Sequence, residues 1–193
     1  MAQLLDKISA DLNALGYARR SQQARAWLQT KAKALAQVSR SALLKDSTRT
    51  TAGAYMGKMF FFYYDPKTKE QLPYYDKFPL VLPIEMYGDG FLGINFHYLP
   101  VNLRVHLLDK LYDLATDQNF DQNTRIQASY SLLNGASRYK EFKPCVKRYL
   151  ASHISSSLVE IGADHWDTAI FLPVHSFQKA GIGTVWADSR KKI

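Results

Sequence analysis

The sequence predicts an α+β fold with N-terminal helices and a basic arm, a small curled antiparallel β-sheet in the middle, and C-terminal helices. Apolar residues recur at helical spacing before residue 40 and again after Pro100, which predicts helices at both ends. Residues 58–99 are rich in aromatic side chains and are interrupted by Pro and Gly, which predicts short strands. The 193 residues are 47% hydrophobic, enough for a sizeable core. We expect a basic helical segment and arm over 1–58 and a compact α+β body over 59–193, forming one folding unit.

Two amphipathic helices are expected at the start of the chain. Apolar side chains fall on one side of a helix over residues 3–15, and Gly16 should end it because glycine readily adopts the conformation that follows a helix. Ser21 should cap a second helix over about 22–38. Residues 45–58 are rich in Ser, Thr and Gly without a period, so we expect a loop or extended arm that becomes ordered on a partner.

Positive charge is concentrated at the start of the chain. Residues 1–58 contain ten Lys or Arg against three Asp, a net charge of +7, whereas the remaining residues carry +1. Such a segment suits contact with nucleic acid or with an acidic face on a partner protein, and a solvated helical face is the simpler alternative. The candidate contacts are Arg19, Arg20, Arg25, Lys31, Lys33, Arg40, Lys45 and Arg49.

Five consecutive aromatic residues occupy positions 60–64, within the string MFFFYYDP. Successive side chains of a strand point to opposite faces, so Phe61 and Tyr63 should share one face while the other face fills the core. The face of Phe61 would meet the chain's own helices, another protein, or nucleic-acid bases stacked on the rings. The candidate interface residues are Phe61, Tyr63, Tyr74 and Tyr75.

Beyond the sheet, apolar spacing predicts further helices over 101–115, 125–134 and about 144–154. Residues 155–186 are expected to hold two short β-segments around a turn, and 182–193 to form a basic tail.

No motif indicates catalysis, a metal ion or a cofactor. The spacing of the histidines matches no known metal-binding motif. The glycines of YGDGFLG are not followed by a helix or by a lysine–serine pair, so they form neither a phosphate-binding loop nor a dinucleotide-binding motif. Cys145, the only cysteine, is expected to be a small core residue. No apolar run approaches the roughly 20 residues that span a bilayer, so no membrane partner is expected. The histidines, expected to be structural, are His97, His106, His153, His165 and His175. The acidic residues of the β-region, expected in turns and on the surface, are Asp65, Asp76, Glu85 and Asp89.

Three strings stand out within residues 57–111: a Gly-x-Met strand ending in YDP, then LPYYDKFPLVLPI, then GFLGINFHYLP followed by LLDKL. Together they resemble a structural protein of T-even-like contractile-tailed bacteriophages, and the basic arm ending in TRTT fits the same family. The resemblance implies a virion component, assembled in the host bacterial cytoplasm, in the tail and baseplate or around the packaged DNA end. It brings no catalytic residue and no cofactor.

The leading expectation is therefore a non-enzymatic structural protein that docks in the tail or baseplate through contacts with other virion subunits. The alternative is a DNA-binding protein at the packaged genome end, a DNA-end protector or neck component, whose +7 segment contacts phosphates. A nuclease or peptidoglycan hydrolase comes third, because no acidic metal cluster or acid pair is recognisable.

Overall fold

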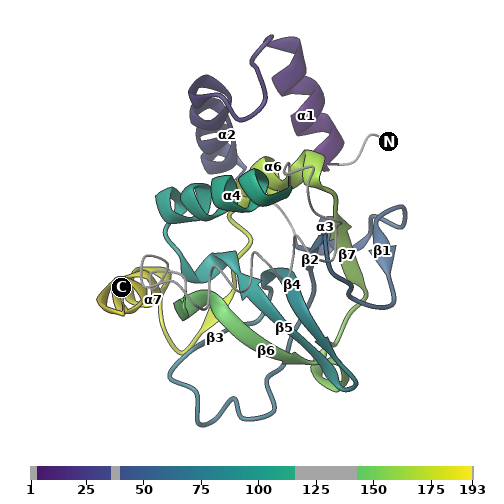
Figure 1. Ribbon diagram of the computed structural model, residues 1–193, viewed down its shortest axis with the longest axis vertical. Helices are drawn as coiled ribbons and strands as arrows, with labels where there is room; N and C mark the ends of the chain where they lie inside the picture. Colours follow the sequence, from purple (N-terminus) through teal and green to yellow (C-terminus); the bar gives the residue numbers. More distant parts are fainter. Residues whose placement is uncertain (1–3, 36–39, 116–142, 193) are drawn as a thin grey trace.

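A computed structural model describes residues 4–35, 40–115 and 143–192. It has a curled antiparallel sheet with helices at both ends, which is the α+β fold predicted from the sequence. Helices α1 and α2 lie above α4 and α6, which cover the sheet, and α7 lies beside β3 near the C-terminus (Figure 1). The helices are α1 Leu4–Ala14, α2 Gln22–Ala34, α3 Arg40–Leu44, α4 Val101–Ala115, α6 Trp166–Phe171 and α7 Ile182–Lys191.

The main sheet has the strand order β1-β7-β2-β4-β5-β6, and all its pairs are antiparallel. Strands β3 and β8 form a separate pair. The register of β4 against β5 shifts between Pro83 and Glu85, where a bulge bends the sheet. The strands are β1 Thr50–Thr51, β2 Met59–Phe61, β3 Tyr75–Asp76, β4 Leu80–Tyr87, β5 Gly90–Asn95, β6 Val146–Leu150, β7 Leu158–Ile161 and β8 Phe177–Gln178. Short 3-10 helices follow three of them: η1 Phe96–Tyr98, η3 Ala151–His153 and η4 Ala163–His165.

The aromatic run separates two hydrophobic clusters, as its alternation predicts. Phe60, Phe62 and Tyr64 belong to a smaller cluster with Phe91 and Tyr149. Phe61 instead joins the larger core that includes residues of α1, α2, α4 and α6. Both faces of this strand are therefore covered by the chain itself.

The sheet curls so that segments distant in sequence meet around the smaller cluster. Tyr64 forms an isolated antiparallel bridge with Ile154, and its hydroxyl accepts a hydrogen bond from the Leu150 N–H at 3.2 Å. The rings of Tyr64 and Tyr149 lie 4.8 Å apart in an edge-to-face arrangement. These contacts connect the end of β6 to the chain that follows β2.

Local signals in the sequence mark the end of α1 and the starts of α2 and α4, whereas α2 ends at Ala34, before the expected residue 38. Gly16 has φ +68° and follows α1, and the Ser21 side chain accepts a hydrogen bond from the Ala24 N–H at the start of α2. The Pro100 carbonyl accepts from the N–H of Arg104, which starts α4. None of the described helices has the length and apolar composition that a membrane crossing requires.

The C-terminal third differs from the prediction. Residues 146–150, expected within a helix, form β6, because pairing with β5 outweighs a weak local helical pattern. Two short β-segments are present beyond it, as β7 and β8, but helix α6 separates them and they belong to different sheets. The expected basic tail is largely the helix α7.

The expected arm over 45–58 contains β1, whose Thr50 pairs with Val159 of β7, so this part of the arm is ordered on the protein's own sheet. The helix expected over 125–134 lies outside the described residues.

Candidate nucleic-acid interface

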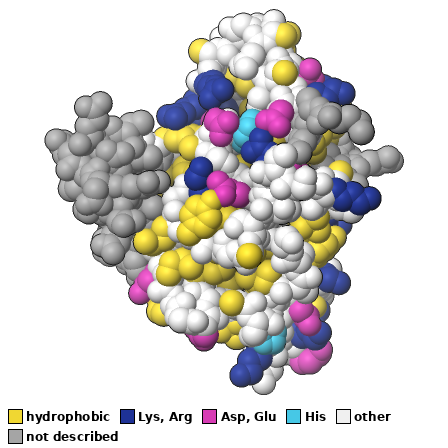
Figure 2. Space-filling view, turned by 90° about the vertical axis from the view of Figure 1, so that its right-hand side faces the viewer, with side chains coloured by type: hydrophobic (Ala, Val, Ile, Leu, Met, Phe, Trp, Pro, Cys, Tyr) yellow, Lys and Arg dark blue, Asp and Glu magenta, His cyan; other side chains and the backbone are white. Residues whose placement is uncertain are grey.

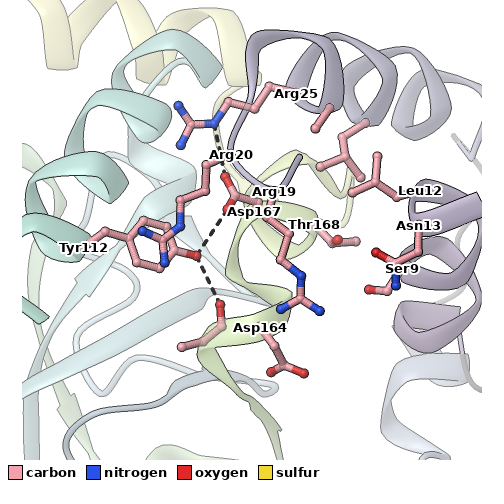
Figure 3. A pocket seen from close by; sticks show the side chains of 13 residues that line it. Ser9, Leu12, Asn13, Arg19, Arg20, Arg25, Tyr112, Asp164, Asp167 and Thr168 are labelled. Atoms are coloured by element: carbon pink, nitrogen blue, oxygen red, sulfur yellow. Dashed lines mark hydrogen bonds and ion pairs between the residues drawn. The ribbon is translucent and has the colours of Figure 1, made fainter. Parts of the chain in front are cut away.

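A pocket of about 180 Å³ lies between the α1–α2 hairpin and the layer formed by α4, η4 and α6 (Figure 3). We call it the arginine pocket, because three of its lining residues are Arg19, Arg20 and Arg25. Tyr112 of α4 and Asp167 of α6 lie on the other side (Figure 3). The predicted basic segment therefore contributes one wall of a concave site.

The turn between α1 and α2 brings Arg19 and Arg20 to this pocket. Gly16 and Arg20 have φ +68° and +65°, so the chain reverses direction between the two helices. A positive φ is uncommon for arginine, because its Cβ crowds the backbone in that conformation. Both arginines are exposed, and Arg19 projects into the space between α6 and α1 (Figure 3).

Arg20 packs on Tyr112. The guanidinium carbon lies 3.4 Å from the centre of the tyrosine ring, a close cation–π contact. The Tyr112 hydroxyl lies 3.1 Å from the Ala163 carbonyl and 3.2 Å from an Asp167 carboxylate oxygen, which fixes the ring. Burial, and then the Asp167 charge, raise the pKa of Tyr112. The hydroxyl therefore stays protonated at neutral pH and donates to these oxygens.

Arg25 has a different role, because its charge is satisfied within the protein. Its two terminal nitrogens donate to the two Asp109 oxygens at 3.0 and 2.5 Å, and Nε donates to Asp167 at 3.1 Å. The bond to Asp109 is the largest cause that raises the pKa of Arg25, and burial opposes it. Arg25 thus ties α2 to α4 and α6 instead of presenting a free charge.

Arg19 and Arg20 are the open cations of the site. Within the described ranges, neither side chain forms an ion pair with a carboxylate. Asp164 and Asp167 do line the pocket, but Asp167 is already engaged by Arg25 and Tyr112, and Asp164 lies 3.3 Å from His165 Nε2. Adjacent guanidinium groups in a concave site suit phosphate oxygens, which accept two parallel hydrogen bonds from one arginine.

Three further candidate contacts are engaged inside the protein. Lys31 pairs with Asp11 at 3.0 Å. Arg40 donates to two backbone carbonyls, those of Val174 and His175. Arg49 contacts two carboxylates and the His165 ring, so its charge is also compensated.

Lys33 and Lys45 are exposed outside the arginine pocket. On the face shown in Figure 2, basic side chains are interspersed with acidic ones and do not form one continuous patch. Part of the positive charge of residues 1–58 is thus compensated within the protein, at Arg25, Lys31, Arg40 and Arg49.

The candidate aromatic interface is largely internal. Phe61, expected on a partner-facing surface, is fully buried and stacks on Phe78 at 5.6 Å, so that expectation is corrected: the chain's own core covers it. Tyr63 and Tyr74 are half-buried against the same core. Tyr75 is half-buried and lines a second pocket, described below.

The expected structural histidines are not all satisfied. His165 contacts Ser9 Oγ at 3.0 Å and Arg49 at 2.9 Å. His97 contacts Asp76 at 2.6 Å through Nδ1, but its buried Nε2 has no partner in the described part of the chain, and neither does Nδ1 of His175.

Among the described residues, no three His, Cys, Asp or Glu side chains are grouped so as to hold a metal ion. Asp76, expected in a turn or on the surface, is buried against His97. Cys145 is buried, as expected for a core residue.

Tyr112, Asp109 and Asp167 were not predicted from the sequence as site residues. Tyr112 falls on the apolar side of its helix, so its sequence position predicts only a core residue. Its contact with Arg20 in the structure shows that it also forms part of the pocket. The two aspartates lie 84 and 142 positions from Arg25, a separation that no local pattern signals.

Comparison with known proteins identifies the family. Neither the curated proteins nor the solved structures contain a match. A family model described as Phage T4 terminal DNA protecting protein matches residues 9–189. This range includes the arginine pocket and nearly the whole chain. The family description matches the alternative expectation, a DNA-end protein, better than the expected docking in the tail or baseplate. The chain therefore belongs to the family of phage T4 terminal DNA protecting proteins.

Proposed function

We propose that this protein binds the ends of the packaged phage genome and shields them without catalysing a reaction. The arginine pocket carries the proposal, because it presents two adjacent exposed arginines that form no ion pair with a carboxylate in the described part of the chain. The family description, which names a terminal DNA protecting protein, supports binding at the ends of the DNA. The protein would be part of the virion after assembly in the host bacterial cytoplasm, next to DNA and other virion subunits.

Recognition of an end requires a contact that the interior of a duplex does not offer. An end exposes the flat face of its last base pair and a terminal phosphate. The turn that carries Arg19 and Arg20 also exposes Leu15 and Tyr17, at 47% and 37% of their full accessibility. We infer that these apolar side chains rest on the last base pair while the arginines hold the phosphates beside it.

Binding can be measured by fluorescence anisotropy with a labelled blunt duplex over a range of salt concentrations. We expect linear DNA to compete far better than closed circular DNA of the same sequence, and affinity to fall steeply with salt. The double variant Arg19→Ala/Arg20→Ala should reduce the salt slope by about 0.9 for each phosphate that the variant no longer neutralises. It should also stop the protein from slowing exonuclease digestion of linear DNA.

The matched control is Lys33→Ala/Lys45→Ala, which removes the same charge from exposed positions outside the pocket. Equal reductions in affinity for the two double variants would mean that DNA is attracted by the overall positive charge of the surface. That result would contradict the proposal that the arginine pocket is the DNA-binding site. No binding at low salt, or equal competition by circular DNA, would reject the proposed function. Cross-linking in intact particles offers an independent test, because sheath, tube or wedge neighbours would point to the tail or baseplate instead.

A further inference from the structure

A second pocket, of about 380 Å³, is lined by none of the residues that line the arginine pocket. We call it the tyrosine pocket, because Tyr64, Tyr75, Tyr98 and Tyr149 all line it. They come from the chain after β2, from β3, from η1 and from β6. Its volume lies within the range of about 300–1,000 Å³ that is typical of small-molecule sites.

The aromatic walls of this pocket are held in place by hydrogen bonds behind them. The Tyr149 hydroxyl accepts from the Asn95 side chain at 3.1 Å, and the Tyr64 hydroxyl accepts from the Leu150 N–H. Tyr64, Tyr98 and Tyr149 are each less than a tenth exposed. The rings therefore do not need to be ordered when a ligand arrives, which reduces the entropic cost of binding.

Positive charge lines the same pocket. Lys67, Lys147 and Arg148 contribute to its walls. The Lys147 ammonium lies 4.3 Å from the centre of the Tyr98 ring, and burial lowers its pKa. Arg148 is engaged by the Asp89 carboxylate and by backbone carbonyls. Lys67 is exposed and forms no ion pair within the described ranges, so it can approach an anion.

Among the described residues that line this pocket, Asp76 is the one carboxylate, and both of its oxygens are engaged by neighbours. Asp76 accepts from the N–H groups of Phe78 and Ser176 at 3.1 and 2.9 Å. Its other oxygen contacts the Asn95 side chain at 3.4 Å and His97 Nδ1 at 2.6 Å. Four neighbours thus occupy the acceptor positions of the carboxylate, and the pocket presents flat aromatic surfaces and cations.

We propose that the tyrosine pocket binds one unpaired nucleotide of a DNA strand, with its base among the tyrosine rings and its phosphate at Lys67. Aromatic faces beside basic side chains are how proteins hold unpaired bases of many sequences. This proposal rests on the proposed function, because DNA is the partner in both. The new element is a second contact: the protein would hold the duplex end at the arginine pocket and one unpaired nucleotide of the same end in the tyrosine pocket.

The test compares blunt duplexes with duplexes that carry a short single-stranded overhang containing 2-aminopurine. We expect the duplex with the overhang to bind about 5- to 150-fold more tightly, which is the gain that one stacked base supplies, and the fluorescence of its 2-aminopurine to be quenched. Tyr75→Ala and Lys67→Ala should each reduce this preference and leave blunt-end affinity unchanged. Lys77→Ala is the matched control, because Lys77 is also exposed but does not line the pocket.

The possible failures are distinguishable. Equal affinity for blunt and overhanging ends, or an overhang preference that both variants retain, would overturn the tyrosine pocket while leaving genome-end binding intact. Loss of blunt-end binding in Arg19→Ala/Arg20→Ala with a retained overhang preference would support two separate sites. No binding of either DNA, and no quenching with the free single-stranded oligonucleotide, would overturn both proposals. Lys67 is exposed, so Lys67→Ala should fold even if Tyr75→Ala does not.

Discussion

The guanidinium group of Arg20 stacks on the Tyr112 ring at 3.4 Å, although the two residues belong to different layers of the protein. The backbone of Arg20 has a positive φ, which is unfavourable for a residue with a side chain. The ring contact offsets part of that cost and keeps the arginine at the pocket rim. A preorganised arginine loses less side-chain entropy when it meets a phosphate.

This relationship predicts different outcomes for two substitutions of Tyr112. Tyr112→Phe retains the ring beneath Arg20, so the affinity for DNA ends should stay within about twofold, whereas removal of the hydroxyl hydrogen bonds should lower stability by about 1 kcal/mol. Tyr112→Leu removes the aromatic face, and the affinity should fall about 2- to 30-fold, the range of a cation–π contact. Anisotropy titrations give the affinity and urea unfolding gives the stability. Equal affinities of the Phe and Leu variants would show that the ring does not position Arg20.

Arg25→Ala should act mainly on folding. It leaves Asp109 and Asp167 without their cation at a partly buried site, so the free energy of unfolding should fall by about 1–3 kcal/mol. Arg19→Ala, at an exposed position in the same pocket, should change stability by less than about 0.5 kcal/mol but weaken DNA binding. For both variants, urea titrations measure the free energy of unfolding and anisotropy titrations measure the affinity for DNA. A stable Arg25→Ala protein with weakened DNA binding would assign Arg25 to the interface.

The contrast between these arginines shows what sequence patterns can and cannot reveal. Helix ends at Gly16 and Ser21 follow from interactions within a few residues, so they were predictable. The two faces of the aromatic run follow from strand geometry alone. The ion pairs of Arg25 depend on how distant helices pack, and net charge does not specify them.

The same limit explains the errors in the C-terminal third. Strand β6 is stabilised by β5, whose residues lie more than fifty positions earlier, and its own five residues carry a weak signal. The tyrosine pocket likewise gathers side chains from four separate segments. Only Tyr75 among them was a predicted interface residue, because its neighbourhood in sequence is aromatic.

Stability should decrease as the pH falls from about 6.5 to about 4. Burial, followed by the charges of His97 and Arg104, lowers the pKa of His175 from 6.5 to about 4, and Asp76 opposes this while Arg40 adds to it. In this window the unfolded chain binds a proton that the folded chain excludes, so acidification favours unfolding. After allowance for solvent screening, the loss should be roughly 1–2 kcal/mol.

Urea unfolding of the wild type and of His175→Asn at several pH values measures this effect. The variant should lose less stability between neutral pH and pH 4, because asparagine does not titrate. Some dependence should remain in the variant, since burial also lowers the pKa of His97. Identical pH profiles for the two proteins would show that His175 protonates freely in the folded state.

Gly88 and Gly90 belong to the same turn between β4 and β5, but substitution by alanine should affect stability strongly at Gly90 and hardly at all at Gly88. A Cβ at Gly90 would lie 2.0 Å from the Tyr149 carbonyl oxygen, and its φ of +153° disfavours a side chain, so Gly90→Ala should cost about 2–5 kcal/mol. A Cβ at Gly88 would meet nothing within 4 Å, and Gly88→Ala should stay within about 0.5 kcal/mol of the wild type. Urea unfolding compares the two, and equal stabilities would contradict the pairing of Gly90 with Leu150 between β5 and β6. Because Tyr149 lines the tyrosine pocket, Gly90→Ala should also reduce the preference for overhanging DNA in whatever fraction remains folded, whereas Gly88→Ala should retain it.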